Sequence, residues 1–218
     1  MKKINYNTDV FQFKELISRI FEFDNLSKTH EKFEIDEISK KSIVDTHKFQ
    51  QSEYHQIYYK NFSQIKPLYE KFILEVIKKE YDGQNLIYQS IPTFRLHFPN
   101  GLSVGMFHKD KDLRDEEWHK SIKEDNYYLP FTNSYDTNTI WYETEEDKGD
   151  FVPMECNYGQ VVKWDGTNLT HGNKINTTED TRISIDFRVA TEENFKNSIK
   201  KSKNEKTFFV LGGYYSKL

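Results

Sequence analysis

The sequence contains a single cysteine, Cys156, among its 218 residues. A lone cysteine excludes a disulfide within the chain, and the scarcity of cysteine fits a reducing compartment. A single cysteine is most often a small apolar residue in a core, so we interpret Cys156 as a packing residue rather than as a reactive thiol.

Long apolar runs are also missing. No stretch of about 18 consecutive apolar residues, the length needed to cross a bilayer, occurs in the chain. Residues 1–9 lack the apolar segment of a secretory signal peptide. We therefore expect no membrane partner and a cytoplasmic location.

The chain has no large excess of charge of either sign. It carries 31 basic and 35 acidic residues, for a formal net charge of −4. Without a basic excess, no strong field attracts nucleic acid, so we expect no nucleic-acid partner. No internal repeat, low-complexity tract or linker divides the sequence, and its length fits one domain, over 1–218, with a sizeable core. The oligomeric state stays open.

Two amphipathic patterns occupy the first 85 residues. Apolar residues recur at helical spacing over 9–21, where Thr8 is placed to cap the first turn. A stronger apolar stripe covers 63–79, and we place Pro67 in the first turn, where proline is tolerated. Both patterns predict helices that cover one outer face of a sheet, so residues 1–85 are expected to be a mainly helical support.

From residue 86 onward the pattern changes to short runs of β-branched and aromatic residues separated by turn signals. This predicts a mainly β chain with N-terminal helices (α+β), in which 86–218 form a double-stranded β-helix, the jelly-roll core of cupin-like proteins. The longest irregular pieces, 111–125 and 131–138, are candidate lids or substrate loops. The expected strands are 93–98, 102–107, 126–130, 139–143, 158–164, 181–189 and 207–210.

His108 and Asp110 form the centre of a candidate metal site. Alternate residues of an extended backbone share a face, so the two side chains can point toward one metal ion. His171 would have to join them from another strand. Two histidines and one carboxylate on one side of a metal leave the opposite positions open, as in non-haem Fe(II) oxygenases, whereas structural zinc sites close all four. Taken alone, His108 and Asp110 could equally be a polar pair near a surface turn.

An arginine lies eleven positions beyond His171. Over 181–188 apolar and polar residues alternate, which predicts a strand with one apolar and one polar face. A hairpin return would bring Arg182 near the metal site. A guanidinium group grips a carboxylate through two parallel hydrogen bonds, so Arg182 is a candidate for binding an acidic ligand.

Together these motifs resemble the Fe(II)- and 2-oxoglutarate-dependent oxygenase superfamily and, more narrowly, its bacterial streptomycin-biosynthesis-type branch. The resemblance covers a little under half the chain, and the order and spacing of the motifs are more specific than any one of them. The matching pieces are PTFR (92–95), FHKD (107–110), NYYLP (126–130), TIWYE (139–143), DG (165–166), HGN (171–173), NT (176–177) and TRISIDFR (181–188).

The resemblance implies a dioxygenase that uses Fe(II), 2-oxoglutarate and O2 and releases succinate and CO2. Its metal ligands would be His108, Asp110 and His171, and the open positions would take the keto acid and dioxygen. Hydroxylation of a small polar metabolite, such as an amino acid, an amino sugar or a natural-product intermediate, is the expected reaction. In related halogenases a small residue replaces the carboxylate, so Asp110 argues against halogenation.

Other residues around this site have more than one interpretation. Arg182 and Ser184 fit the family pattern for 2-oxoglutarate binding better than Arg188, which is further along the same strand face. Arg188 is then expected to pair with Asp186 or another acid, or to contact substrate. Arg95 is either a contact for a substrate carboxylate or half of a structural ion pair, and Asn126 is either a pocket residue near the co-substrate or a hydrogen-bonding residue at a strand end.

Two further histidines and three alternative functions remain to be considered for this sequence. His97 and His119 lack an acidic partner at ligand-like spacing, so we do not expect them to bind the metal. A jelly roll with paired histidines could also be a metal-binding module without turnover, or an isomerase of the cupin type. Arg182 argues against both, because its carboxylate-gripping role has no use without a keto acid. A third alternative is hydroxylation of a side chain on a partner protein.

Overall fold

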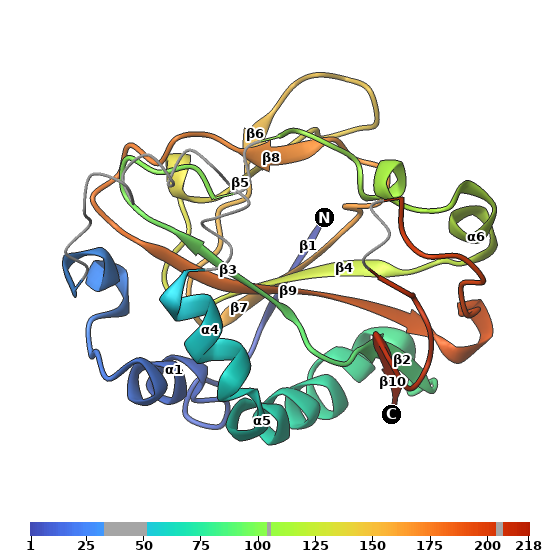
Figure 1. Cartoon of the computed structure of the whole chain (residues 1–218), viewed down its shortest axis with the longest axis horizontal. Coiled ribbons are helices and arrows are strands. Elements are labelled where there is room, and N and C mark those ends of the chain that lie inside the picture. Colours follow the sequence, from blue (N-terminus) through green and yellow to red (C-terminus); the bar gives the residue numbers. More distant parts are fainter. Residues whose placement is uncertain (33–51, 104–105, 204–206) are drawn as a thin grey trace.

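The computed structural model describes residues 1–32, 52–103, 106–203 and 207–218, which fold into two antiparallel sheets with helices on one side (Figure 1). In the described ranges the larger sheet has the strand order β1-β7-β4-β9-β2-β10, with β3 also paired to β9, and the smaller has the order β6-β5-β8. The strands of the larger sheet are β1 (Lys2–Asn5), β2 (Leu86–Gln89), β3 (Thr93–His97), β4 (Asp125–Pro130), β7 (Gln160–Trp164), β9 (Arg182–Thr191) and β10 (Tyr215–Lys217). Those of the smaller sheet are β5 (Ile140–Tyr142), β6 (Val152–Pro153) and β8 (His171–Asn173).

Strand β9 is the centre of the larger sheet. It pairs with β4 on one side and with β3 and then β2 on the other. Its apolar residues Ile183, Ile185, Phe187 and Val189 are fully buried or nearly so in the main core. Because side chains alternate along a strand, the polar residues between them face the opposite side of the sheet, toward the candidate site.

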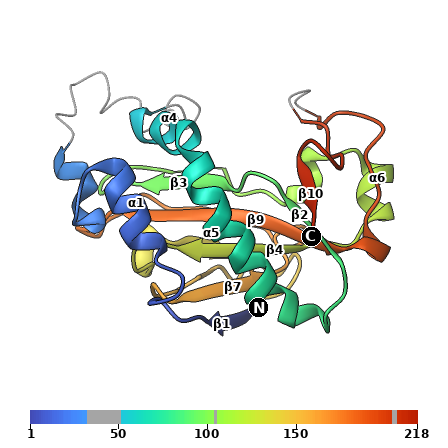
Figure 2. The ribbon, with the colours of Figure 1, turned by 90° about the horizontal axis from the view of Figure 1, so that it is seen from below.

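The helices cover the apolar face of the larger sheet, in agreement with the sequence prediction (Figure 2). They are α1 (Phe13–Phe21), α4 (Glu53–Lys60) and α5 (Phe62–Glu75), and α5 is followed by a 3-10 helix (Ile77–Tyr81). The fully buried Phe72 of α5 meets the rings of Tyr6, Phe11 and Phe13 edge-on at centroid distances of 5.1–5.4 Å. No helix in the described part of the chain is long and apolar enough to cross a membrane.

The helix boundaries differ from the predicted ones. Helix α1 begins at Phe13, and the predicted cap Thr8 lies instead in a turn. That turn is closed by the side chain of Asn7, whose Oδ1 accepts from the Asp9 amide at 2.8 Å, so the backbone is not helical there. Pro67 lies beyond the first turn of α5, because the helix begins at Phe62.

Two predicted strands are absent from the described residues. Those of 102–107 form no strand, and the loop around them is bonded instead to Asn176, which exchanges backbone hydrogen bonds with Asn100 and Gly101. Residues 207–210 form no strand either. The backbone amides of Thr207 and Phe209 donate instead to the side-chain hydroxyls of Ser202 and Ser198. The C-terminal strand is β10 instead, which lies after this segment in the sequence. The sequence prediction also missed β1, because its residues do not alternate between apolar and polar.

The predicted irregular segment 111–125 contains a short helix, α6 (Glu116–Ser121). Asp115 caps it, since its Oδ1 accepts from the backbone amide of Trp118 at 3.1 Å. Trp118 is buried and stacks on Phe209 with ring centroids 4.7 Å apart. The segment is therefore anchored to the C-terminal part of the chain by an aromatic pair.

Cys156 is a packed core residue, as the sequence interpretation holds. It is 2% exposed, in a cluster with Tyr142, Met154 and Val162 between the two sheets' strands. Burial raises the pKa of its thiol to about 12, which keeps it protonated and unreactive.

Candidate active site

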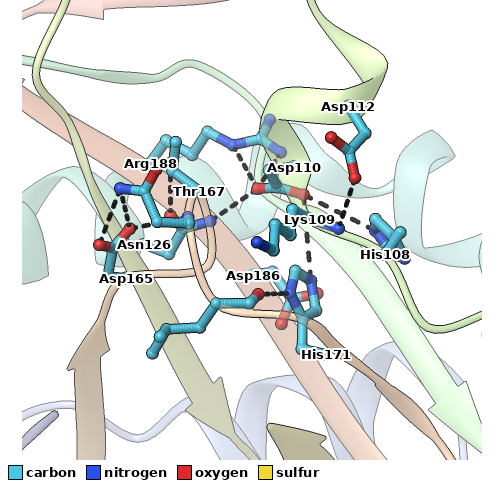
Figure 3. A network of polar contacts seen from close by, with 12 residues as sticks. His108, Lys109, Asp110, Asp112, Asn126, Asp165, Thr167, His171, Asp186 and Arg188 are labelled. Atoms are coloured by element: carbon cyan, nitrogen blue, oxygen red, sulfur yellow. Dashed lines mark hydrogen bonds and ion pairs between the residues drawn. The ribbon is translucent and has the colours of Figure 1, made fainter. Parts of the chain in front are cut away.

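His108, Asp110 and His171 meet between the two sheets (Figure 3). Their donor atoms all lie within 4.8 Å of one another. Asp110 Oδ1 is 3.8 Å from His108 Nε2 and 4.0 Å from His171 Nε2. In the described part of the chain this is the group of histidine and carboxylate side chains that could hold a metal ion.

Backbone hydrogen bonds fix the relative positions of these three residues. The His108 amide donates to the His171 carbonyl at 2.9 Å, and the His171 amide donates back to the His108 carbonyl at 3.0 Å. This is an isolated antiparallel bridge between the loop before Asp110 and strand β8. The Asp110 amide in turn donates to the Gly166 carbonyl at 3.1 Å. Segments more than 50 residues apart in sequence are thus fastened together at the site.

Both histidine rings present the nitrogen that a metal needs. His108 Nδ1 lies 2.8 Å from the Met106 carbonyl, and His171 Nδ1 lies 2.9 Å from the Leu169 carbonyl. A carbonyl oxygen can only accept, so each Nδ1 carries the proton and each Nε2 lone pair faces Asp110. Burial lowers the pKa of His171, which favours its neutral, metal-binding form. The donor set and its orientation therefore fit one divalent metal ion.

Asp110 is held as a carboxylate with its two oxygens in different surroundings. Oδ2 accepts from Arg188 Nη2 at 2.7 Å and from Asn126 Nδ2 at 2.8 Å, while Oδ1 faces the imidazoles. Burial alone would raise the pKa of Asp110, but the positive charge and hydrogen bonding of Arg188, together with the charge of Arg114, outweigh it and hold the pKa well below its usual range. The group is thus ionised, as a metal ligand must be.

Arg182 lines the same pocket. The residue is 1% exposed, and its one hydrogen bond runs from Nη2 to Ser103 Oγ at 3.1 Å. Its Nε and Nη1 have no partner, nor has the hydroxyl of Ser184, two residues along the strand. Among the described residues no carboxylate lies within ion-pair distance of Arg182. A buried guanidinium with free donors fits an anionic ligand.

The remaining predicted site residues all line this pocket. Arg188 is bound to Asp110, and its predicted pairing with an acid is therefore observed. Asn126 donates to the same carboxylate, so it contacts a metal ligand as well as lining the pocket. Arg95 forms an ion pair with Asp186 at 2.9 Å, the second of its two interpretations. Contact of Arg95 or Arg188 with a substrate stays a prediction.

His97 and His119 take no part in the metal-ligand group. The ring nitrogens of His97 lie 3.0 and 3.1 Å from the backbone carbonyls of Gly101 and Asn138. Burial lowers the pKa of His97 to about 3, so it is a neutral core residue.

Sequence reasoning missed the residues behind Asp110. Arg114 and Glu124 form a buried ion pair there, and Tyr214 and Tyr215 approach from the C-terminal segment. The one sequence signal was the spacing of Arg114 four residues after Asp110, which places the two on one side of a helical turn. Glu124 and the two tyrosines carried no local pattern.

Gly172, directly after His171, allows the His108 loop to approach strand β8. A Cβ at this position would lie 2.9 Å from two ring carbons of Phe107 and 3.1 Å from its Cα. We expect Gly172→Ala to push Phe107 and the adjoining His108 away, to destabilise the protein by about 1–3 kcal/mol and to weaken metal binding. Urea unfolding and a metal titration measure the two effects.

The matched control for this substitution is Gly83→Ala. Gly83 has a φ of +77° but nothing within 4 Å of an added Cβ, so alanine there is strained without touching the site. It should lower stability and leave metal affinity unchanged. Wild-type metal affinity in Gly172→Ala would show that the close approach does not position His108.

Comparison with known proteins identifies the family. No protein-family model matches the chain. The chain is 34% identical over 166 residues to the streptomycin biosynthesis protein StrG of Streptomyces griseus, and the aligned region covers 76% of each protein. It belongs to the family of that protein, which confirms the bacterial streptomycin-biosynthesis-type branch that the motifs resemble.

The chain also shows partial likeness to solved structures of non-haem oxygenases. The nickel complex of the non-haem monooxygenase ThoJ is 12% identical, with a TM-score of 0.49 over 91% of this chain and 76% of that one. CytC3 with Fe(II) and α-ketoglutarate is 13% identical, with a TM-score of 0.49 over 88% of this chain and 72% of that one.

Proposed function

We propose that this protein is an Fe(II)- and 2-oxoglutarate-dependent dioxygenase that hydroxylates a small polar metabolite. The observation that carries the proposal is the buried guanidinium of Arg182, free of any described counter-ion, in the same pocket as the His108, Asp110 and His171 group. A metal-binding module without turnover has no use for such a cation. The two sheets enclosing the pocket would then be those of a double-stranded β-helix.

His108, Asp110 and His171 would hold the metal. Three donors on one side of a metal ion would leave the opposite positions for a bidentate ligand and dioxygen. When bound, iron with 2-oxoglutarate supplies an oxidant strong enough to attack an unactivated carbon–hydrogen bond, with release of succinate and CO2. The chain itself supplies the fixed Nε2 atoms, the single free oxygen of Asp110 and a buried setting that limits side reactions.

Arg182 would bind the far carboxylate of 2-oxoglutarate. Its unpartnered Nε and Nη1 lie on the two different edges that each share Nη2, so either edge could make a bidentate bond with a carboxylate. The unpartnered hydroxyl of Ser184 lies two residues along the same face of β9 and would donate a further hydrogen bond. The Arg182 charge also removes the cost of burying an anion there.

The substrate would lie against the polar wall formed by Gln89, Thr93, Arg95 and Asp186. Asp186 gives one oxygen to Arg95, while its buried Oδ1 has no partner and would accept from a hydroxyl or amine of the substrate. A wall with donors and acceptors of both charges fits a small polar molecule. The name of StrG refers to streptomycin biosynthesis, which supports a natural-product intermediate as the metabolite.

Succinate release tests the proposed reaction without the prime substrate. Because the metal site and Arg182 would bind 2-oxoglutarate without the prime substrate, purified protein with Fe(II), ascorbate and oxygen should slowly convert it to succinate. Succinate is quantified by mass spectrometry, with Asp110→Ala protein as the blank. If no succinate forms with any amino acid, amino sugar or nucleotide sugar added, the chain is a binding module and the proposed reaction is wrong.

A further inference from the structure

The two carboxylate oxygens of Asp110 have different surroundings. Its Oδ2 is surrounded by donors, since Arg188 contributes Nη2 at 2.7 Å and Nε at 3.3 Å and Asn126 contributes Nδ2 at 2.8 Å (Figure 3). Its Oδ1 has no such donor and faces the Nε2 atoms of His108 and His171. The carboxylate therefore presents one oxygen to a metal and keeps the other in the protein.

Arg188 is itself held in place from behind. Its Nη1 donates to the hydroxyl of Tyr214 at 2.5 Å, and its Nε lies 3.4 Å from Glu124 Oε1. Glu124 is also bound by Arg114 and by the Tyr215 hydroxyl, the latter at 2.6 Å. Because Nε, Nη1 and Nη2 of Arg188 all have partners, moving the guanidinium to follow a rotating Asp110 carboxylate would break its bonds to Tyr214 and Glu124.

The charges in this network balance. Arg114 and Arg188 carry two positive charges, and Asp110 and Glu124 carry two negative ones; three of these side chains are buried or nearly so and Arg188 is partly buried. A buried charge without a partner is strongly disfavoured. Rotation of Asp110 Oδ2 toward a metal would break its charge-assisted hydrogen bonds and leave Arg188 undercompensated.

We propose that Arg188 is a positioning residue that, together with Asn126, makes Asp110 a one-oxygen ligand and so keeps three metal positions open. This rests on the proposed function, because a keto acid needs two of those positions and dioxygen one. If both Asp110 oxygens bound the metal, one of the three positions would be closed. Tyr214 and Tyr215 of the C-terminal segment support this arrangement, because their hydroxyls hydrogen-bond to Arg188 and Glu124 respectively.

Water-proton relaxation of the Mn(II)-loaded protein tests the number of open positions. Mn(II) favours octahedral coordination and takes the same ligands as Fe(II), so three open positions hold three waters. In Arg188→Gln we expect Asp110 to turn its second oxygen to the ion, displacing one water and lowering relaxivity by about a third. We also expect the Kd for Mn(II) to change by about 10- to 100-fold, as for residues that orient metal ligands.

Asn126→Ala provides a second variant that keeps the charge balance. It removes one donor from Asp110 Oδ2 and leaves Arg188, so relaxivity should fall in the same direction and by less. The control is Lys163→Gln, which breaks a 2.9 Å ion pair between Lys163 and Asp125 on the same sheet. The Lys163 side chain is 23% exposed, close to the 21% of Arg188. It should lower stability without altering relaxivity.

The outcomes separate this inference from the proposed function. Wild-type relaxivity in both Arg188→Gln and Asn126→Ala, with Mn(II) bound, would overturn the positioning role and leave the oxygenase proposal standing. Failure of the wild-type protein to bind Mn(II) would overturn both. If relaxivity fell in Lys163→Gln by as much as in Arg188→Gln, the fall would reflect a general loss of structure. That result would also overturn the positioning role.

Discussion

Replacing His171 by alanine should abolish metal binding at the site and all turnover. Two donors would remain, His108 and Asp110, and the His108 loop would keep its backbone bridge to β8, since that bridge uses no side chain. Loss of a direct ligand should weaken metal affinity beyond the roughly 10- to 100-fold seen for residues that only orient ligands. Calorimetric titration with Mn(II) and succinate release measure the two effects.

His119→Ala is the control for this substitution. His119 carries a buried Nδ1 without a partner and could be mistaken for a ligand, but it is not part of the metal-ligand group. We expect this variant to bind metal as the wild type does. Wild-type metal stoichiometry and activity in His171→Ala would show that the assignment of the three ligands is wrong.

Replacing Arg182 by Gln should raise the concentration of 2-oxoglutarate required for succinate release by roughly thirtyfold or more. The guanidinium is buried, and loss of a charge-assisted bidentate pair in such a setting costs on the order of 2–5 kcal/mol. The stability of the variant should not fall in proportion, because Arg182 has one hydrogen bond, to Ser103, and no described counter-ion. A titration of 2-oxoglutarate with metal content matched gives the answer.

Arg95→Gln is the matched control, because it removes a second arginine from the same pocket wall. Arg95 already has a partner in Asp186, so its loss should leave 2-oxoglutarate dependence unchanged when no prime substrate is present. Arg188→Gln is the variant that could contradict the assignment of Arg182 as the 2-oxoglutarate-binding residue. A larger rise in the 2-oxoglutarate requirement with Arg188→Gln than with Arg182→Gln, at equal metal content, would move the co-substrate site to Arg188.

Most of what the sequence predicted depends on short-range pattern. The alternation over 181–188 predicted both the strand β9 and the common polar face of Arg182, Ser184 and Arg188, because side chains on a strand alternate whatever lies around them. The helical stripe of 63–79 predicted α5 and its buried face for a similar reason. The spacing of His108 and Asp110, with the motif resemblance, indicated the ligand set that the structure brings together.

Boundaries and isolated strands were not predictable in this way. The segment 207–210 has strand-like residues, but the amides of Thr207 and Phe209 donate to the hydroxyls of Ser202 and Ser198. The polar strand β1 exists because β7 offers it an edge to pair with. In both cases a hydrogen-bond partner outside the segment itself decides the local structure.

The sequence by itself determined the kinds of side chain available and their faces: two imidazoles, a carboxylate, and arginines on one side of a strand. Only the tertiary structure decided their partners. It placed Arg188 on Asp110 Oδ2 and gave Arg182 no counter-ion among the described residues, although both arginines project from the same face of β9. The physical reason is that a strand's periodicity fixes direction, whereas ion pairing depends on which distant segments, here those carrying Glu124 and Tyr214, are folded against each end of that strand.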